Sequence, residues 1–244
     1  MQNNLHLLTG WGASCNVWKP IIPALESCYQ VNCITPSWVR ESNDDRSLEN
    51  IEGYLESYAN LVDDAPVSLI AWSMGGLIAI RLAEKFPGLV DQIIFIASAP
   101  QFLADENFKY GIGKEWFDNF VESFKKQPQE TLKKFIALQA QGDENAISTA
   151  RFLKTHSDFN NYHFYECLFG LNLLGEEQLS NKFESLQCKS AFIHGDKDAV
   201  LSYEAAKNIA IQANSDFYII ENAGHVPHVS HPEETIRIIK SILR

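Results

Sequence analysis

Short apolar runs alternate with helical patterns along most of this 244-residue chain, and no other feature constrains its fold as strongly. The runs lie at residues 5–8, 29–34, 67–71, 92–97, 190–194 and 216–220. Apolar side chains recur at helical spacing within residues 48–62, 75–86, 202–213 and 233–243. Short apolar runs are typical of strands that are buried on both faces, and strands that alternate with helices form parallel sheets. The sequence therefore predicts an α/β fold with a mostly parallel, doubly wound sheet.

The alternation breaks between about residues 100 and 187. This stretch is rich in Phe, Lys and Gln, has mostly helical spacing and contains no convincing strand. Ligands of open α/β sheets bind at the carboxyl ends of the strands, and an insertion after the fourth strand is expected to cover that edge. We therefore predict a core made of residues 1–100 and 187–244 and an inserted helical lid made of residues 101–186.

The composition restricts the class of protein and its partners. The chain is 45% hydrophobic, which is enough for one sizeable core. It has no apolar run of about 18 residues and no signal-peptide pattern, so we expect a cytoplasmic protein without a membrane span. The net charge of −11 argues against nucleic acid and against an anionic membrane as partners. We expect a monomer.

The charge is uneven along the chain. Residues 125–154 hold six basic and three acidic side chains, although the chain as a whole is acidic. Such a run is most often a solvated face, but here it stands out against the overall charge.

Five cysteines occur, at positions 15, 28, 33, 167 and 188. Their number is odd and their spacing does not match that of metal ligands. This usage predicts reduced, mostly packed thiols and no metal site.

The most specific motif lies where a strand pattern passes into a helix pattern, in the segment "AWSMGG" at residues 71–76. The chain must reverse direction there within very few residues, so small side chains are expected around the turn. Ser73 has Ala71 two residues before it and Gly75 two residues after it, close to the Gly-x-Ser-x-Gly pattern of a nucleophile elbow. A serine that caps an ordinary helix is the alternative. The strand–turn–helix context favours a nucleophile.

A nucleophilic serine needs a base to remove its proton and an acid to orient that base. Both are expected in loops after later strands, in the chain order Ser, acid, His. The acid is Asp196 or Asp198, which follow the strand at 190–194. We favour Asp198 as the acid and expect Asp196 to stabilise the turn.

Three histidines follow the last predicted strand. His225 comes after Ala223-Gly224 in the first turn, and we expect it to be the base. His228 is expected to line the site or to lie on the surface, and His231, before Pro232, to cap the last helix. The order along the chain therefore predicts a triad of Ser73, an aspartate and His225.

A tetrahedral oxyanion needs two preorganised N–H donors. The first is expected from Met74, which follows the nucleophile at the start of a helix. The second is expected from Trp11 in the loop "LTGWG", because Gly10 and Gly12 allow that backbone to come close to a ligand.

The chain resembles the α/β-hydrolase superfamily over nearly its whole length, and within it the pimeloyl-[acyl-carrier-protein] methyl ester esterases of biotin synthesis. The segments that carry the likeness are "GWG" at 10–12, "WSMGGL" at 72–77, "ASAPQF" at 97–102, "FIALQAQG" at 135–142, "DKDAV" at 196–200 and "GHVPHVSHPEE" at 224–234. The elbow and the histidine loop are shared across the superfamily, whereas the lid segment and Trp72 are narrower signals. The chain departs from the superfamily pattern at Thr9, where a histidine is usual, and at Ala71, where a glycine is usual.

The resemblance implies roles for individual residues. The triad of the family matches Ser73, Asp198 and His225, and its oxyanion donors match the N–H groups of Trp11 and Met74. Its acyl-pocket aromatic residues correspond to Trp72 and Phe135. Its basic lid residues, which hold the phosphopantetheine and the acidic carrier protein, correspond to Lys134 and Arg151.

The predicted function is a serine carboxylesterase that needs no cofactor and hydrolyses the methyl ester of pimeloyl-[acyl-carrier protein] to release methanol. One rival is a general short-chain carboxylesterase of the same fold, because the fold does not determine the substrate. Another is a hydrolase-fold ligand-binding protein with little turnover.

Overall fold

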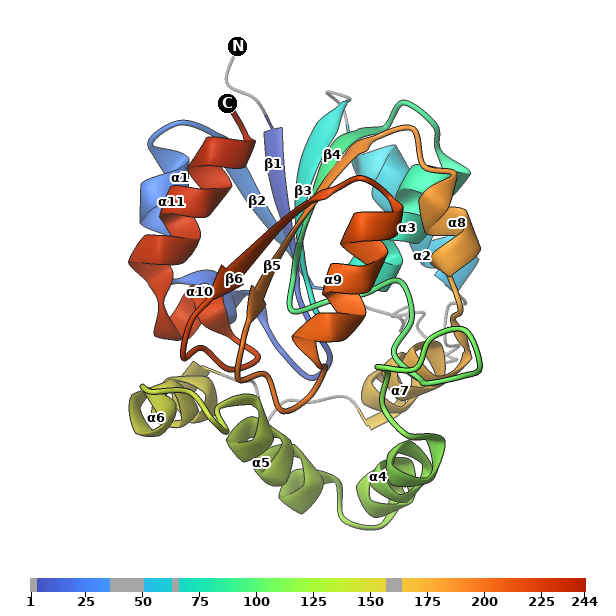
Figure 1. Cartoon of the computed structure of the whole chain (residues 1–244), viewed down its shortest axis with the longest axis vertical. Helices are drawn as coiled ribbons and strands as arrows, with labels where there is room; N and C mark the ends of the chain where they lie inside the picture. The colour runs from blue at the N-terminus through green and yellow to red at the C-terminus, as the bar shows by residue number, and fades with distance from the viewer. Residues whose placement is uncertain (1–3, 36–50, 63–65, 157–163) are drawn as a thin grey trace, which may run out of the picture.

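Parallel strands form one sheet through the middle of the protein in this computed structural model, which describes residues 4–35, 51–62, 66–156 and 164–244 (Figure 1). Within these ranges the sheet has six strands in the order β2-β1-β3-β4-β5-β6. They are β1 (Asn4–Leu8), β2 (Gln30–Ile34), β3 (Val67–Trp72), β4 (Val90–Ile96), β5 (Lys189–Gly195) and β6 (Asp216–Ile220). The six predicted strands and the parallel α/β fold are confirmed.

Helices cover both faces of the sheet. One face carries α2 (Ile51–Leu61), α3 (Gly75–Lys85), α8 (Ser180–Glu184) and α9 (Tyr203–Gln212). The other carries α1 (Ile22–Glu26) and α11 (Pro232–Ile242), with the 3₁₀ helix η1 (Cys15–Trp18) and α10 (Pro227–Ser230) nearer the carboxyl edge. The sequence did not predict η1, α1, α8 or α10, because four or five residues are too few to show a helical period. The first three residues of the predicted helix 48–62 lie outside the described ranges.

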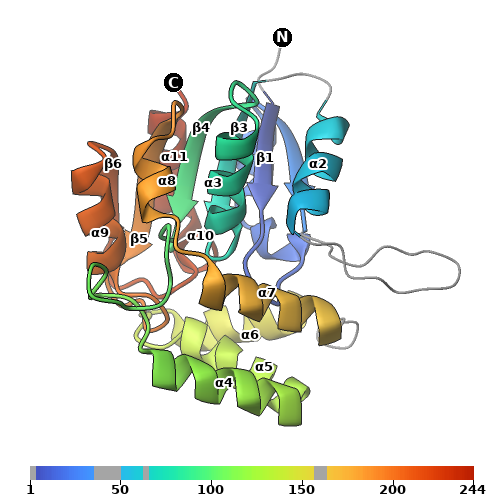
Figure 2. The same cartoon turned by 90° about the vertical axis from the view of Figure 1, so that its right-hand side faces the viewer.

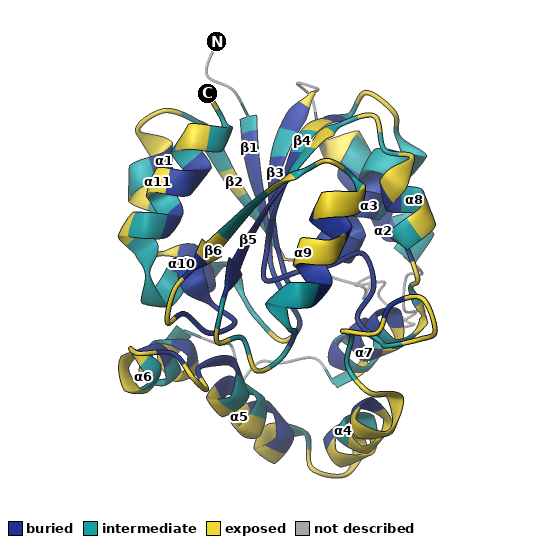
Figure 3. Ribbon diagram, viewed as in Figure 1, coloured by how far each residue is buried: buried dark blue, intermediate teal, exposed yellow. Residues whose placement is uncertain are grey.

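Side chains that alternate along each strand build two cores, one on each face of the sheet. On β3, Leu69 and Ala71 face the core beneath α2, α3 and α9, while Ile70 and Trp72 face the core beneath α1 and α11. Figure 3 shows the central strands as the most deeply buried part of the fold. A strand that is buried on both faces has little room to change register, so the ends of the strands are firmly placed.

Helices α4 (Lys114–Lys126), α5 (Pro128–Gln139), α6 (Ala146–His156) and α7 (Phe164–Glu176) lie across the carboxyl ends of the strands (Figure 2). This is the edge that the insertion was expected to cover. Helix α8, although inside the predicted lid range, packs on the sheet, where Phe183 meets the rings of Phe95 and Phe192 edge-on. A separate movement of the segment 101–186 as a lid stays a prediction.

The expectation of five reduced thiols is wrong for one pair. Cys15 and Cys33 form a disulfide that joins η1 to the edge strand β2. These residues are 18 positions apart in the sequence, and only the return of the chain beside β1 brings them together. Cys28, Cys167 and Cys188 are free, and burial raises the pKa of Cys167 to about 12.

No helix in the described ranges combines the length and the apolar character that crossing a bilayer would require.

Candidate active site

Ser73 stands on a strained turn directly after β3. Its φ of +54° lies in the left-handed region, which residues other than glycine rarely adopt. The Ser73 N–H donates to the carbonyl of Ile96 at 3.0 Å, and the Ser98 hydroxyl donates to the carbonyl of Ser73 at 2.7 Å. Both contacts come from the end of β4 and the residues after it, so the neighbouring strand holds the strained turn in place.

The two glycines after Ser73 are required by close packing. A Cβ on Gly75 would lie 2.7 Å from the carbonyl oxygen of Leu8 at the end of β1. A Cβ on Gly76 would lie 2.1 Å from the Ser98 Oγ. The segment "SMGG" therefore brings α3 against two neighbouring strand ends, as a nucleophile elbow requires.

Ser73, His225 and Asp198 form a continuous hydrogen-bonded chain. The Ser73 Oγ lies 3.0 Å from His225 Nε2, and His225 Nδ1 lies 2.8 Å from Asp198 Oδ2. The carboxylate can only accept, so His225 Nδ1 carries a proton and Nε2 is free to accept the proton of Ser73. The three residues that the sequence singled out therefore meet at distances suited to proton transfer.

The side chain of Asp198 is fully buried and surrounded by donors. Its Oδ1 accepts the N–H groups of Val200 at 2.8 Å and Leu201 at 3.0 Å. Burial alone would raise the pKa of Asp198, but the charge of His225 and hydrogen bonds from His194 and His225 outweigh burial and hold this pKa well below its usual range. Asp198 is therefore ionised at neutral pH in the folded protein.

The choice between the two aspartates follows from these contacts. Asp196 Oδ1 accepts the N–H of Asn222 at 2.6 Å, and its Oδ2 pairs with Lys197. Asp196 thus holds the turn, as expected, and takes no part in orienting His225.

The other two histidines differ from what the sequence suggested. His228 neither lines the cavity nor lies on the surface, because its ring is buried between Trp18 and Trp72. Burial, with a smaller effect from His225, lowers the pKa of His228 to about 3. His231 occupies the N-cap position of α11, but its side chain makes no capping hydrogen bond and instead contacts Glu144 and Ser230. The predicted capping role is wrong for that side chain.

The lid helices hold the main chain around His225. The His225 N–H donates to the carbonyl of Gln139 at 3.0 Å, and the Gly224 N–H donates to Asp143 Oδ2 at 2.9 Å. Gln139 ends α5 and Asp143 follows it, so both contacts come from the inserted segment. On the other side, Trp72 Nε1 donates to the carbonyl of His225 at 2.9 Å. The His225 loop is thus held between the inserted helices and β3.

Two N–H groups near Ser73, those of Trp11 and Met74, are without an acceptor in the part of the chain that the structure describes. A Cβ on Gly10 would lie 3.0 Å from the Ser73 Cβ, which shows how closely the loop before Trp11 approaches the nucleophile. Met74 stands at the N-terminus of α3, where the helix favours negative charge. Their role as oxyanion donors stays a prediction.

The Trp11 side chain is held by the lid. Its Nε1 donates to the carbonyl of Cys167 on α7 at 2.7 Å, and its ring meets Phe120, Phe124 and Phe135 edge-on. The predicted oxyanion loop is therefore in contact with α4, α5 and α7.

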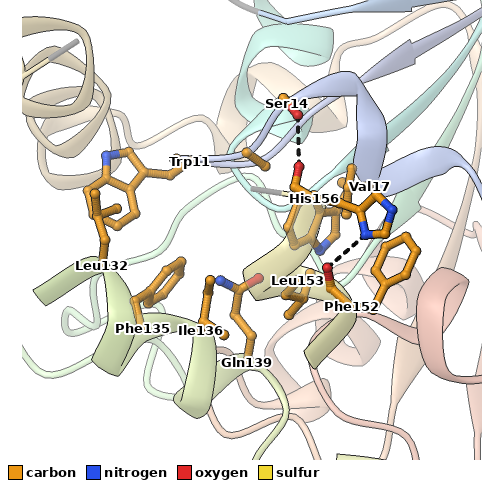
Figure 4. A pocket seen from close by; sticks show the side chains of 13 residues that line it. Trp11, Ser14, Val17, Leu132, Phe135, Ile136, Gln139, Phe152, Leu153 and His156 are labelled. Carbon is orange, nitrogen blue, oxygen red and sulfur yellow. Dashed lines mark hydrogen bonds between the residues drawn. The ribbon is translucent and has the colours of Figure 1, made fainter. Parts of the chain in front are cut away.

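A small cavity lies between the Trp11 loop, η1, α5 and α6 (Figure 4). Its volume is about 20 Å³, which is little more than one water molecule needs. Trp72 and Phe135, the predicted acyl-pocket residues, both line it. The remaining walls come from Trp11, Gly12, Ala13, Ser14, Val17, Leu132, Ile136, Gln139, Phe152, Leu153 and His156. The lining is mostly apolar, which suits an acyl chain.

Lys134 and Arg151 are exposed on α5 and α6. Neither has an acidic partner within the described residues, whereas Lys125 and Lys133 each pair with a glutamate three residues earlier. Lys134 also borders a groove of about 330 Å³ between α4 and α5. The groove is further lined by Trp116, Asn119, Phe120, Ser123, Thr131, Phe135 and Leu138.

Sequence reasoning missed three residues that support the site: His194, Ser98 and Asp143. His194 donates to Asp198, Ser98 to the elbow carbonyl, and Asp143 accepts from the histidine loop. A signal existed for the first two, because each is a polar residue at the carboxyl end of an apolar strand pattern. Asp143 had no such signal, since its contact depends on how the lid folds back. Within the described ranges no cluster of three side chains is suited to a metal ion.

The α/β-hydrolase fold family matches residues 3–232. The chain is 30% identical to the biotin biosynthesis bifunctional protein BioHC of Teredinibacter turnerae over 98% of its length, and spans 44% of that protein. It is 29% identical to the pimeloyl-[acyl-carrier protein] methyl ester esterase of Photobacterium profundum, over 99% of this chain and 95% of that one.

Solved structures give the same fold. A bromoperoxidase from Bacillus anthracis superposes with a TM-score of 0.88 at 18% identity, covering 100% of this chain and 92% of its own. The esterase EaEST from Exiguobacterium antarcticum superposes with a TM-score of 0.84 at 20% identity, covering 98% of this chain and 91% of its own. At such identities the likeness concerns the fold and not the reaction.

Proposed function

The chain belongs to the α/β-hydrolase fold family, and we propose that it is a serine esterase of biotin synthesis that hydrolyses the methyl ester of pimeloyl-[acyl-carrier protein]. Its family and its esterase relatives make it a carboxylic ester hydrolase. The observation that carries the mechanism is the hydrogen-bonded chain of Ser73, His225 and Asp198, at 3.0 and 2.8 Å.

In the proposed reaction His225 Nε2 takes the proton of Ser73 as the Oγ attacks the ester carbonyl. The carbonyl oxygen becomes an oxyanion, which the N–H groups of Trp11 and Met74 stabilise. The bond to the methoxy oxygen breaks, and His225 returns the proton to it, so that methanol leaves. Water then attacks the acyl-enzyme with the same help from His225, which releases the free carboxylate and restores Ser73.

The identity of the acyl group is supported by the relatives and by the cavity. The Photobacterium relative is named for the pimeloyl-[acyl-carrier protein] methyl ester, and the family match covers the whole site. The cavity beside Trp72 and Phe135 is mostly apolar, but it is small while the lid is closed. A seven-carbon chain therefore requires the lid helices to move apart.

The carrier is supported by the charges on the lid. A carrier-linked substrate places a phosphate and an acidic protein outside the site, and this chain has a net charge of −11. Unpaired cations on the lid would offset that repulsion locally, and Lys134 and Arg151 are two such cations. The groove beside Lys134 reaches Phe120 and Phe135, which both touch Trp11. We propose that this groove receives the phosphopantetheine arm.

The test measures methanol release from the methyl ester of pimeloyl-[acyl-carrier protein] and from monomethyl pimelate. The Lys134→Glu/Arg151→Glu variant should lower kcat/KM about tenfold or more for the carrier-linked ester only, and less so at high salt. The matched control is Lys125→Glu/Lys133→Glu, which changes the net charge equally but alters lysines that are already paired.

Three outcomes would contradict parts of this proposal. An equal loss of kcat/KM in both double variants would mean that only the net charge matters. It would contradict specific contacts of Lys134 and Arg151 with the carrier. Fast hydrolysis of short esters without preference for the carrier would reduce the protein to a general carboxylesterase. A single burst of product without steady turnover would indicate a hydrolase-fold binding protein.

A further inference from the structure

A second histidine shares the catalytic carboxylate. His194 stands next to the end of β5, four residues before Asp198, and its side chain is fully buried. Its Nε2 lies 2.9 Å from Asp198 Oδ2 and 3.0 Å from the carbonyl oxygen of Leu201. Both neighbours can only accept, so Nε2 carries a proton and donates to both. Within the described part of the chain its Nδ1 has no partner.

The oxygen that His194 contacts is the one that orients His225. Asp198 Oδ2 accepts from His194 at 2.9 Å and from His225 at 2.8 Å, while Oδ1 accepts two backbone N–H groups. Four donors therefore determine the rotation of the carboxylate. They also share its negative charge, so the electrostatic attraction between Asp198 and His225 depends on the hydrogen bond from His194.

We propose that His194 is a positioning residue of the esterase. Its hydrogen bond orients Asp198 Oδ2 toward His225, and it weakens the attraction of that carboxylate for the second proton of His225. The inference rests on the proposed triad. His194 touches neither Ser73 nor the position of the substrate carbonyl, so it acts through Asp198 alone.

The consequence is a specific change in pH dependence. The base must be free of its second proton to accept one from Ser73, so activity is lost at low pH, where the His225 ring carries two protons. Without the His194 donor, the charge on Asp198 Oδ2 is less dispersed and holds a proton on His225 more strongly. The acidic limb of the profile should therefore move to higher pH.

Few other ionisable groups can cause such a shift. In the described ranges His194, on β5, and His228, on α10, act electrostatically on the triad, and the carboxylate of Asp143, after α5, accepts the N–H of Gly224 next to His225. His228 contacts Trp18 and Trp72 rather than Asp198, and both His228 and Asp143 are left unchanged in the variants of this experiment.

The experiment measures kcat/KM for p-nitrophenyl acetate from pH 5 to 9, because this ester tests the triad without a carrier. His194→Phe keeps a planar ring but has no donor, and should move the acidic limb up by roughly half to one pH unit and lower the plateau about tenfold. His194→Gln keeps a donor near the position of Nε2, and its acidic limb should stay at the pH of the wild type. His194→Asn is too short to reach Asp198, and should behave as His194→Phe does with less crowding.

Packing is controlled on the same strand. Phe192 lies two residues before His194 on the same side of β5 and is fully buried, so Phe192→Leu disturbs packing without touching Asp198. It should lower the melting temperature and leave the acidic limb unchanged.

The outcomes separate this inference from the proposed function. An unchanged acidic limb in both His194→Phe and His194→Asn would overturn the role of His194 while the esterase proposal stands. A shift in His194→Gln as large as in His194→Phe would assign the effect to ring packing and overturn it equally. Turnover that persists in Ser73→Ala would instead contradict the proposed triad, and with it the proposed esterase mechanism.

Discussion

Ser73 and His225 lie 3.0 Å apart, yet different parts of the molecule hold them. The core alone builds the Ser73 turn, through the end of β1, the end of β4 and Ser98. The His225 loop is bounded instead by Trp72 on one side and by Gln139 and Asp143 on the other. Ser73, the proposed nucleophile, thus belongs to the sheet, whereas His225, the proposed base, lies between the sheet and the lid.

The kind of contact differs as well. Around Ser73 close packing adds to two hydrogen bonds, because Gly75 and Gly76 leave no room for a methyl group. Around His225 the constraints are hydrogen bonds to the backbone, which a small displacement of α5 would lengthen. Opening of the lid should therefore disturb the base before it disturbs the nucleophile. This division would keep Ser73 poorly activated until the lid closes over a substrate.

The largest expected effect removes the nucleophile. Ser73→Ala should lower kcat by about 10⁴-fold or more, because no other side chain can form the acyl-enzyme. The sheet holds the turn, so the circular dichroism spectrum and melting temperature should match those of the wild type. A melting temperature that falls by more than a few degrees would mean that the hydroxyl also holds the two regions together.

The pH dependence of stability tests the His225 side of the site through His228. Its pKa is about 3 in the folded protein and about 6.5 in an unfolded chain, so unfolding takes up a proton between these values. The stability that depends on the uncharged ring is complete above pH 6.5 and is lost as the pH falls toward 3. His228→Phe removes this loss.

The comparison uses urea unfolding at two pH values. Near pH 7.5 the free energies of unfolding of wild type and His228→Phe should agree within about 1 kcal/mol, because the rings are similar in volume. At pH 4.5 the variant should gain about 2–3 kcal/mol relative to the wild type. If the free energies of unfolding of the two proteins change with pH to the same extent, His228 is not a buried uncharged ring. Acid then destabilises the protein through another part of the loop.

The same contrast explains what the sequence could predict. The strands and Ser73, Asp198 and His225 could be placed because local period and order along the chain determine them. The Cys15–Cys33 disulfide could not, since it depends on how two segments lie beside β1. His231 was misassigned for a similar reason: Glu144, 87 residues earlier in the chain, binds the ring that was expected to cap α11.

Gly76→Ala tests the close packing around Ser73. The new Cβ would meet the Ser98 Oγ at 2.1 Å and should cost about 1–3 kcal/mol of unfolding free energy. Ser98→Ala alone removes the hydrogen bond to the Ser73 carbonyl and should cost about 1 kcal/mol. In the double variant the closest contact is gone, so urea unfolding should give a cost below the sum of the two. Additive costs would mean that α3 shifts as a whole and that the elbow is less rigid than its contacts indicate.

The smallest expected effect tests the lid side most directly. Asp143 accepts the Gly224 N–H at 2.9 Å and the Asn145 N–H at 2.6 Å, and Asp143→Ala leaves both donors without an acceptor. We expect kcat/KM for a small ester to fall about tenfold, because the backbone of the base is then less well placed.

A matched control for this change lies in the same insertion. Asp105 also accepts two backbone N–H groups, from Asn107 at 2.7 Å and Phe108 at 2.8 Å, but makes no contact with the histidine loop. Asp105→Ala should therefore destabilise its own loop and leave kcat/KM within about twofold of the wild type. An equal loss of activity in both variants would mean that any loosening of the insertion slows the enzyme. No loss in Asp143→Ala would mean that β3, through Trp72, holds His225 without the lid, and that nucleophile and base belong to one rigid unit after all.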